Sequence, residues 1–345
     1  MTNDKRLGYA VVGLGRISQV GVLPAFRHSR KAKLVAVVSG NLRKAKRLAA
    51  HFGASASFTY ENYDQCLANP DVDAVFIATD NGTHARYSVQ AARAGRHVLS
   101  EKPMARTPDE CRQMIRACRE SNVRLMIAYR KYFEPASLAL KKLVADGKLG
   151  KLKLIHSAFT IFLPSRKSVP AWHLDPASSG GGSLVDLGVY CVNTIRWLTE
   201  LEPVEASAYS WTTHTECFSR VEESIGFQLK LADALFVQAT ASFGAAQSSF
   251  LKVFGEKGWA ALDPAFAFDE ERRLFGKIGG RWFEKRFTVI DEFALELDAF
   301  ADCIRQGKDP DPDGREGLRD VLVMQAIYQA AREGRWVSID SAPEA

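Results

Sequence analysis

Several features that would direct a chain to a membrane, a disulfide framework or a metal site are missing from these 345 residues. No apolar run approaches the roughly 18–20 residues of a membrane span. Residues 1–6 hold neither a secretory signal nor a twin-arginine signal. The six cysteines form no C-x-x-C pair and the seven histidines form no H-E-x-x-H pattern, so neither disulfides nor a zinc site are predicted. We therefore expect a cytoplasmic protein with no membrane partner and no metal.

The chain also lacks a concentrated run of charge of one sign. Its net charge is +6, and the basic residues are dispersed instead of forming one stripe. This distribution favours an anionic small ligand, and we expect no nucleic-acid partner. A hydrophobic share of 46% and a charged share of 25% are ordinary for a globular protein. At this length two domains are expected.

The first part of the chain alternates strands and helices. Apolar runs are expected to form strands at residues 7–12, 33–39, 74–78, 97–100 and 124–128. Helices are expected at residues 18–28 (interrupted near Pro24), 42–52, 83–94 and 109–121. This alternation is typical of a doubly wound parallel sheet, the Rossmann fold that binds dinucleotides. We assign residues 1–128 to an NAD(P)-binding domain.

The pattern changes after residue 128. A helix expected at 135–146 precedes strands at 152–162 and near 204–212, 224–231, 234–243 and 249–255. Amphipathic helices around 292–306 and 315–332 close the chain. Consecutive strands predict an α+β domain with a large open, mostly antiparallel sheet. We assign residues 129–345 to this second domain, for substrate binding and oligomerisation.

A glycine-rich turn follows the first strand. The sequence from Gly13 through Gly15, Arg16 and Ile17 to Ser18 is a dinucleotide turn with serine in place of the third glycine. The first glycine permits a tight turn, and the second lets backbone amides approach a pyrophosphate at a helix N-terminus. Its place in a strand–turn–helix unit favours cofactor binding over a purely structural turn.

The end of the second strand selects the cofactor. NAD-binding enzymes usually place an acid here to hold the ribose 2′-hydroxyl. This chain has Ser39, followed by Arg43 and Lys44, and no carboxylate. A 2′-phosphate needs donors and positive charge, so these three residues predict NADP as the cofactor. The neighbouring Lys46 and Arg47 are expected to lie on a solvated helix face.

Two further loops follow strands of the same sheet. Thr79, Asn81 and His84 come after the third expected strand and are candidates for contact with the cofactor, although a helix cap is the alternative. Glu101 and Lys102, before a proline, come after the fourth. Ligands of an open parallel sheet lie at the carboxyl ends of its strands, so we expect both loops to face the cofactor.

The second domain contributes acid–base candidates. A glycine run leads into a helix that Ser183 is expected to cap, with Asp186, Tyr190 and Asn193 on one helical face. Buried polar groups need partners, so this stripe favours a site over a core helix. Gly188 within the helix indicates a close packing contact. Tyrosine, with a pKa near ~10, is a poor base unless a cation lowers it, and a lysine supplies that charge.

In this order the elements strongly resemble the glucose–fructose oxidoreductase/inositol dehydrogenase (Gfo/Idh/MocA) family. Five separated elements agree, at residues 13–18, 79–84, 101–103, 172–174 and 180–190. The resemblance implies a Rossmann domain, and an open sheet through which members form dimers or tetramers. It also implies catalytic roles for the lysine of the E-K-P motif, Lys102, and the aspartate of the G-G-G-x-x-x-D motif, Asp186. The Lys102–Pro103 bond is expected to be cis by the same resemblance.

Two features indicate which branch of that family the chain resembles most. Inositol dehydrogenases carry histidine where Tyr190 stands, so Tyr190 is similar to the glucose–fructose oxidoreductase and dihydrodiol dehydrogenase branch. The basic turn after Ser39 resembles the NADP-binding turn of glucose–fructose oxidoreductase. One departure is His173 after Trp172, where that branch often has arginine, which leaves the substrate's polar contacts open. The secretion signal and proline-rich arm of the periplasmic enzyme are not seen, so the resemblance does not by itself imply a cofactor that stays bound between turnovers.

Together, the residues and the resemblance predict an NADP-dependent oxidoreductase acting on CH–OH groups. It would transfer a hydride between nicotinamide and a sugar (an aldose or pyranose) or a related cyclic polyol. Tyr190 would relay the hydroxyl proton, Lys102 would polarise the oxygen, and Asp186 would orient the sugar and the lysine. Trp172 and His173 would border the substrate, with a core role as the alternative for Trp172.

Two alternatives stay open. The first is a trans-dihydrodiol dehydrogenase or a 1,5-anhydrofructose reductase-like enzyme with the same machinery. The second is a non-catalytic regulator that senses a sugar or nucleotide, against which the intact Lys102, Asp186 and Tyr190 argue.

We also expect a homodimer or homotetramer. Alternating apolar residues in the second domain (Leu229, Leu231, Leu235 and Val237) predict a sheet with helices on one face and a second subunit on the other.

Overall fold

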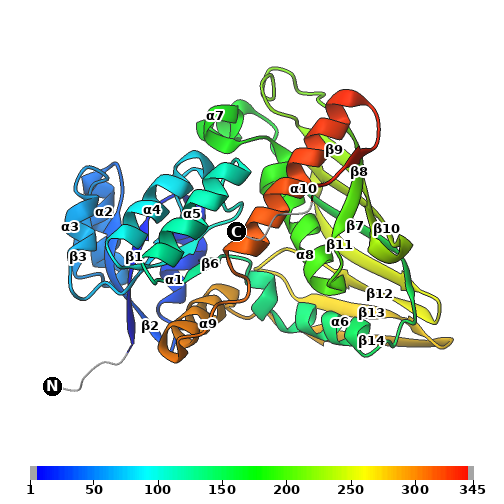
Figure 1. The fold of residues 1–345 in the computed structure, drawn as a ribbon, viewed down its shortest axis with the longest axis horizontal. Helices are drawn as coiled ribbons and strands as arrows, with labels where there is room; N and C mark the ends of the chain where they lie inside the picture. The colour runs from blue at the N-terminus through cyan, green and yellow to red at the C-terminus, as the bar shows by residue number, and fades with distance from the viewer. Residues whose placement is uncertain (1–5, 341–345) are drawn as a thin grey trace. The chain divides into compact units, whose positions relative to one another are not determined.

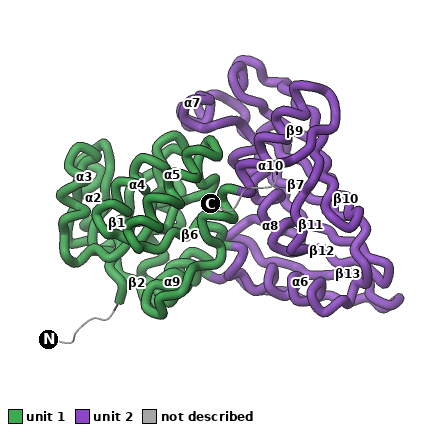
Figure 2. Tube along the Cα trace, viewed as in Figure 1, with its two compact units in different colours: residues 1–130, 291–318, 345 green, residues 131–290, 319–344 purple. Residues whose placement is uncertain are grey.

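The computed structural model describes residues 6–340 (Figure 1). The chain divides into two compact units (Figure 2). Within the described residues, unit 1 contains 6–130 and 291–318, and unit 2 contains 131–290 and 319–340. The C-terminal part of the chain therefore contributes to both units. No helix among residues 6–340 is long and apolar enough to cross a membrane.

Unit 1 is built on a six-stranded parallel sheet. Its strands are β1 (Leu7–Val12), β2 (Ala32–Val38), β3 (Ala56–Phe58), β4 (Ala74–Ile77), β5 (His97–Ser100) and β6 (Leu125–Ile127). They are ordered β3-β2-β1-β4-β5-β6, with every pairing parallel. The chain reverses its direction of winding at β1, and ligands of such sheets bind at the strand ends beside this switch. The predicted Rossmann fold is confirmed.

Several helices of unit 1 begin where the sequence supplies a capping side chain. They are α1 (Leu23–Ala25), α2 (Leu42–Phe52), α3 (Tyr63–Leu67), α4 (His84–Arg93), α5 (Pro108–Glu120) and α9 (Glu292–Gln306). Asn41 accepts a hydrogen bond from the Lys44 amide to start α2, and Thr107 accepts one from Glu110 to start α5. Helix α9 comes from far along the chain, yet the Tyr9 hydroxyl of β1 donates to the Leu297 carbonyl. It therefore belongs to this unit's core.

The expected interruption near Pro24 takes another form. Residues Ser18–Val22 form a π-helical turn, η1, which runs directly into α1. The Leu23 amide bonds to the Ser18 carbonyl, five residues back, and Pro24 sits in the first turn of α1. Proline lacks an N–H and is tolerated in a first turn, so the wider turn lets the backbone stay helical through it.

Unit 2 is built on a nine-stranded open sheet. Its strands are β7 (Leu152–Phe162), β8 (Pro203–Trp211), β9 (Ser224–Leu231), β10 (Phe236–Ser242), β11 (Gly244–Gly255), β12 (Gly258–Asp263), β13 (Arg272–Ile278), β14 (Arg281–Phe287) and β15 (Val337–Ser338). Their order is β14-β13-β12-β11-β7-β10-β9-β8-β15. Only the pair β7–β10 is parallel among these strands. The predicted large, mostly antiparallel sheet is confirmed, and β12 to β15 extend it beyond the strands expected from sequence.

Helices cover one face of this sheet, as Figure 1 shows for α6 and α8. The helical elements of the region are η3 (Arg130–Phe133), α6 (Pro135–Ala145), η4 (Arg166–Ser168), η5 (Ala171–Leu174), α7 (Pro176–Ser179), η6 (Leu184–Gly188), α8 (Val189–Thr199), η7 (Ala232–Ala234) and α10 (Gly314–Glu333). The Ser157 hydroxyl of β7 contacts the Cys191 thiol of α8, and buried Asp320 of α10 accepts from Asn193 and Arg196 of α8.

The two faces of the sheet differ in how far the chain covers them. Leu229, Leu231, Leu235 and Val237 are each at most 1% exposed, because this chain's own elements already bury them. The opposite face carries the uncovered apolar surface, including Tyr209 (71% exposed) and Trp282 (59% exposed). Alternation along a strand shows that one face is apolar, but it does not say which face the chain covers itself.

Candidate functional site

The glycine turn lies at the carboxyl end of β1. Gly13 has a φ of +94°, and a Cβ on it would lie 2.4 Å from the Ala78 carbonyl oxygen after β4. Gly15 differs, because a Cβ there would meet nothing within 4 Å. Buried Ser18 donates its hydroxyl to the Gly13 carbonyl at 2.6 Å. The turn is thus fixed from within and leaves open space at Gly15, beside the exposed Arg16 and half-buried Ile17.

The expected 2′-phosphate site lies at the carboxyl end of β2. Ser39 is buried, and its hydroxyl oxygen accepts from the Asn41 amide at 3.3 Å. Arg43 is exposed and Lys44 half-buried in the first turn of α2. Among residues 6–340, neither cation has a carboxylate within ion-pair distance, so both charges are available to a ligand. Two cations and the start of a helix together suit an anion.

His84 joins the loops that follow β4 and β5. Its ring nitrogens lie 3.0 Å from the Pro103 carbonyl and 3.3 Å from the Thr79 carbonyl. Burial lowers the pKa of His84, while the contacts with these two carbonyls oppose that shift. Asn81 is buried within the short turn η2 (Asn81–Thr83). The side chain of Thr83 bonds to Thr79 and Asp80 and does not cap α4.

The E-K-P motif occupies the carboxyl end of β5. The Lys102–Pro103 bond is cis, as the resemblance implied. Glu101 is buried and its carboxylate accepts from the Lys102 amide at 3.1 Å, whereas Lys102 itself is half-buried. Lys102 therefore lies just after the carboxyl end of β5 and is partly accessible, whereas Glu101 beside it is buried in unit 1.

Sequence reasoning missed the acidic residues that α9 adds around Glu101. Glu292 is buried and forms an ion pair with Arg130 at 2.5 Å. Glu296 is fully buried, and burial, followed by the charge of Glu101, raises the pKa of its carboxyl well above the ordinary value. No motif signals this neighbourhood, because α9 lies about 190 residues further along the chain.

In unit 2, Asp186 lies beside His173. The His173 Nδ1 and Asp186 Oδ2 atoms are 3.8 Å apart, with side chains 17% and 31% exposed. The Trp172 and His173 rings have centroids 3.8 Å apart. The half-buried Trp172 thus packs on the histidine and not in the interior of the unit. These three side chains form one partly accessible cluster.

Tyr190 is held by two phenylalanine rings. Its ring centroid is 5.5 Å from that of Phe159 on β7 and 5.7 Å from that of Phe266. Tyr190 is half-buried, in contrast to its neighbours Val189 and Cys191. One polar side chain thus remains partly accessible at the start of an otherwise buried helix.

The helix that carries these residues departs from expectation in two ways. Leu184–Gly188 forms a π turn, and Ser183 makes no capping bond but donates its hydroxyl to the Ala241 carbonyl. Asn193 is 1% exposed and donates to Asp320. It therefore belongs to a buried structural network, unlike Asp186 and Tyr190, which are partly accessible. The wider turn breaks the regular spacing on which a helical face is counted. The expectation for Gly188 is confirmed, since a Cβ there would meet Leu184 at 2.8 Å.

A half-buried acid, Glu222, anchors the glycine run before Asp186. The Glu222 carboxylate accepts from the Gly182 amide, the Leu184 amide and the Tyr328 hydroxyl, each at 2.9 Å. A Cβ on Gly182 would lie 2.0 Å from the Glu222 carbonyl oxygen. Burial raises the pKa of Glu222, and these hydrogen bonds oppose that rise. The glycines thus allow close approach of an anchor that sequence reasoning missed.

The structure therefore brings the expected residues together in two groups. In unit 1, β1, β2, β4 and β5 present the candidate cofactor residues at their carboxyl ends: Gly13, Gly15, Arg16, Ile17, Ser39, Arg43, Lys44, Thr79, Asn81, His84, Glu101 and Lys102. In unit 2, Trp172, His173 and Asp186 form one cluster, and Tyr190 lies one helical turn after Asp186.

Comparison with known proteins decides the family. Residues 7–129 match the model described as an oxidoreductase family with an NAD-binding Rossmann fold, and residues 137–261 match the GFO/IDH/MocA C-terminal domain. The chain belongs to the Gfo/Idh/MocA family. It is accordingly an oxidoreductase with a nucleotide-binding Rossmann unit.

Individual members of the Gfo/Idh/MocA family are similar over nearly the whole chain. A D-xylose 1-dehydrogenase (NADP(+)) of Haloarcula marismortui is 31% identical over 98% of this chain and 94% of the relative. A 1,5-anhydro-D-fructose reductase of Ensifer adhaerens is 30% identical over 96% and 98%. The crystal structure of an aldose–aldose oxidoreductase from Caulobacter crescentus, complexed with glycerol, has a TM-score of 0.92 at 35% identity, covering 97% and 100%.

Proposed function

We propose that this protein is an NADP-dependent oxidoreductase that transfers a hydride between nicotinamide and a sugar (an aldose or pyranose) or a related cyclic polyol. The observation that carries the proposal is the accessible Asp186 and Tyr190 of unit 2, in a chain whose relatives are named for aldose chemistry. In this proposal, residues 1–128 bind the nucleotide and residues 129–345 bind the substrate.

The residues of unit 1 fit NADP. The open space at Gly15 suits a pyrophosphate against the start of a helix, where a side chain would intervene. Ser39, Arg43 and Lys44 offer a hydroxyl and two cations without carboxylate partners to a 2′-phosphate. The Haloarcula relative is itself named for NADP(+). Thr79, Asn81, His84 and Glu101 would hold the ribose and nicotinamide side.

The chemistry divides between the two units. When bound, nicotinamide accepts or supplies the hydride. Tyr190 takes the hydroxyl proton during oxidation and returns it during reduction, and Lys102 stabilises the negative charge that develops on the same oxygen. Asp186, oriented by His173, binds substrate hydroxyl groups. Trp172 covers the histidine and offers an apolar surface to a sugar ring.

A second candidate function has specific support. The Ensifer relative is named a 1,5-anhydro-D-fructose reductase and is almost as similar to this chain as the Haloarcula relative. The same proton and hydride steps would then reduce a ketone in an anhydro-sugar. A trans-dihydrodiol dehydrogenase would use them too, whereas a sensing regulator would bind ligand without turnover.

One assay separates these functions. The purified protein is given aldoses, inositols, dihydrodiols and 1,5-anhydrofructose, each with NADP(H) and NAD(H), and nicotinamide absorbance is followed. The proposal predicts turnover of an aldose or cyclic polyol with NADP(H). Turnover of 1,5-anhydrofructose or a dihydrodiol alone selects the second candidate, and cofactor binding without any turnover selects the regulator.

A further inference from the structure

One of the two rings beside Tyr190 comes from a connection between strands. Phe266 lies between β12 and β13 and is 1% exposed. Its ring centroid is 5.7 Å from that of Tyr190 and 5.5 Å from that of Phe159, and Phe159 is 5.5 Å from Tyr190. The three rings are therefore mutual neighbours. Two of them surround the tyrosine from different parts of the sheet.

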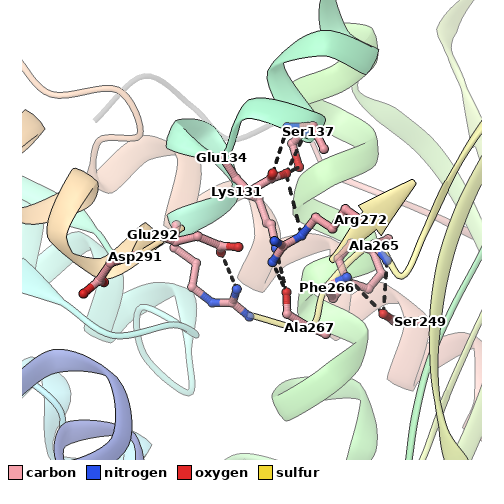
Figure 3. A network of polar contacts seen from close by, with 12 residues as sticks. Lys131, Glu134, Ser137, Ser249, Ala265, Phe266, Ala267, Arg272, Asp291 and Glu292 are labelled. Carbon is pink, nitrogen blue, oxygen red and sulfur yellow. Dashed lines mark hydrogen bonds and ion pairs between the residues drawn. The ribbon is translucent and has the colours of Figure 1, made fainter. Parts of the chain in front are cut away.

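The backbone around Phe266 is fixed by polar contacts on both sides (Figure 3). The buried Ser249 hydroxyl oxygen accepts from the Ala265 amide at 3.2 Å and from the Phe266 amide at 3.0 Å. On the other side, the Ala267 carbonyl accepts from the Lys131 ammonium at 3.1 Å and from the Arg272 guanidinium. These contacts hold the backbone of Phe266 and of the residues directly before and after it.

The two cations are themselves held in place. Arg272 is 0% exposed and Lys131 is 2% exposed. The Glu134 carboxylate lies 3.9 Å from the Arg272 Nε atom and also accepts from the Ser137 amide at 2.7 Å. A buried charge cluster is weak evidence for stability, because well-packed apolar residues of the same volume often serve the fold as well or better. Its presence here calls for a geometric reason.

We propose that Phe266, anchored by Ser249, Lys131 and Arg272, is a positioning residue that fixes the orientation of the Tyr190 ring. The inference rests on the proposed function, in which the Tyr190 hydroxyl moves a proton. Packed aromatic rings prefer defined offset or edge arrangements, so a ring fixed through its backbone limits how far its neighbour can swing about χ1. Proton transfer needs a heavy-atom distance of about 2.6–3.2 Å, so a change in χ1 that swings the whole phenol removes the hydroxyl from reach.

The test is a double-mutant cycle with D-xylose and NADP⁺ as the probe reaction. Phe266→Leu in the otherwise native protein is expected to lower kcat about tenfold or more, with KM for NADP⁺ unchanged. In a Tyr190→Phe background the same change is expected to cost less than about twofold, because there is no hydroxyl left to position. Equal losses in both backgrounds would overturn the proposal, since a merely structural role is independent of the hydroxyl.

A matched control removes a different phenylalanine ring, elsewhere in the sheet. Phe227 is 2% exposed on β9, two strands from β7. Phe227→Leu makes a cavity of the same kind, and its effect on kcat is expected to be the same in both Tyr190 backgrounds. Ser249→Ala removes the acceptor of two amides and is expected to reproduce the Phe266→Leu pattern more weakly.

A second measurement does not depend on turnover. The protein is labelled with 3-fluorotyrosine, and the ¹⁹F resonance that disappears in Tyr190→Phe is assigned to Tyr190. One dominant line is expected in the native protein, and several lines or one broadened line in Phe266→Leu, because a ring that is no longer held samples several positions. A single Tyr190 line as sharp as the native one in Phe266→Leu would overturn the proposal.

The two levels of failure are distinguishable. If Tyr190→Phe keeps native turnover, the proposed role of the tyrosine fails, while the ¹⁹F spectrum still decides whether Phe266 orients the ring. If Tyr190→Phe is impaired but the cycle shows no coupling and the ¹⁹F line stays single and sharp in Phe266→Leu, the proposed function survives and the positioning role fails.

Discussion

The two units build their functional groups in different ways. In unit 1 the candidate residues sit on the short loops that follow strands or in the first turn of the next helix, so each is placed by the strand that precedes it. In unit 2, Asp186 and Tyr190 lie on a helix whose start is held by Glu222 and whose tyrosine is flanked by Phe266. Local sequence motifs are enough to predict the arrangement in unit 1. The arrangement in unit 2 depends on residues distant in sequence, and substitutions should therefore act differently in the two units.

The largest effect is expected at the residues to which the proposed function assigns proton transfer. Tyr190→Phe removes the proton acceptor and should lower kcat about 10²–10⁴-fold, while NADPH affinity changes little. Lys102→Met should cost at least as much, and the double variant little more than the worse single one. Steady-state kinetics and fluorescence titration of NADPH measure both quantities. Tyr209→Phe, which removes an exposed hydroxyl from the same unit, is the control.

If Tyr190→Phe kept native turnover across the pH range, the tyrosine would be a packing residue. Asp186 would then become the candidate proton acceptor.

Cofactor choice tests the local character of unit 1. Ser39→Asp introduces a carboxylate that repels a 2′-phosphate, and it should weaken NADPH binding about 10- to 100-fold without affecting the fold. Arg43→Gln should weaken NADPH binding in the same direction, whereas Arg47→Gln, one turn further along α2, should not. Fluorescence titration with NADPH and NADH measures these affinities. Equal affinity of the native protein for both cofactors would contradict the assignment.

Two glycine substitutions compare the units directly. Gly182→Ala places a Cβ 2.0 Å from the Glu222 carbonyl oxygen, and should lower the free energy of unfolding by about 1–3 kcal/mol. Gly15→Ala adds a Cβ to open space, so it should leave stability within about 0.5 kcal/mol while weakening NADPH binding. Thermal denaturation without cofactor measures the first effect. A large stability loss in Gly15→Ala would remove the distinction between the two turns.

Unit 2 also presents the surface for self-association that we propose. Trp282→Glu on the exposed sheet face should weaken a homodimer or homotetramer by about 1–2 kcal/mol per contact, because buried tryptophans dominate such interfaces. Leu138→Glu changes an equally apolar, 44% exposed residue of α6 on the helical side and should have no effect. Sedimentation velocity distinguishes these outcomes. A concentration-independent 38.1 kDa species for the native chain would contradict the proposal.

The smallest effect concerns pH and the loop-joining His84. Burial lowers its folded-state pKa below the ordinary value of 6.5, so protonation favours the unfolded chain. Its contribution to stability is complete above pH 6.5 and declines as the pH falls below that value. His84→Gln should therefore lose less stability than the native protein between pH 7 and about pH 5. Denaturant titrations across this range would contradict the argument if both proteins fell in parallel.

The limits of sequence reasoning follow from the same contrast. The order of strands and loops in unit 1 was predictable because the G-x-G turn and the E-K-P motif are local. The capping role expected for Ser183 was wrong, because the chain enters a π turn at Leu184–Gly188 and Ser183 donates its hydroxyl to the Ala241 carbonyl. Asn193 was counted in a polar stripe, but its partner is Asp320 of α10, 127 residues further along the chain.

The partners of the site in unit 2 could not have been found from a pattern. Glu222, Tyr328 and Phe266 lie 36, 142 and 80 residues after Asp186 and carry no motif. Their roles follow only from hydrogen bonds and ring contacts that form once the sheet has folded. Residues that position a site through packing are in general less visible in sequence than residues that touch a ligand.

The central claim is that a sugar hydride passes to NADP⁺ on this protein. It is tested most directly with D-xylose deuterated at C1, supplied with NADP⁺ and the native enzyme, with D-glucose deuterated at C1 in parallel. The account predicts NADPH that carries the deuterium on its nicotinamide ring, together with a slower rate for the labelled sugar. Reduced cofactor without deuterium, or no reduction with any aldose or cyclic polyol, would contradict it.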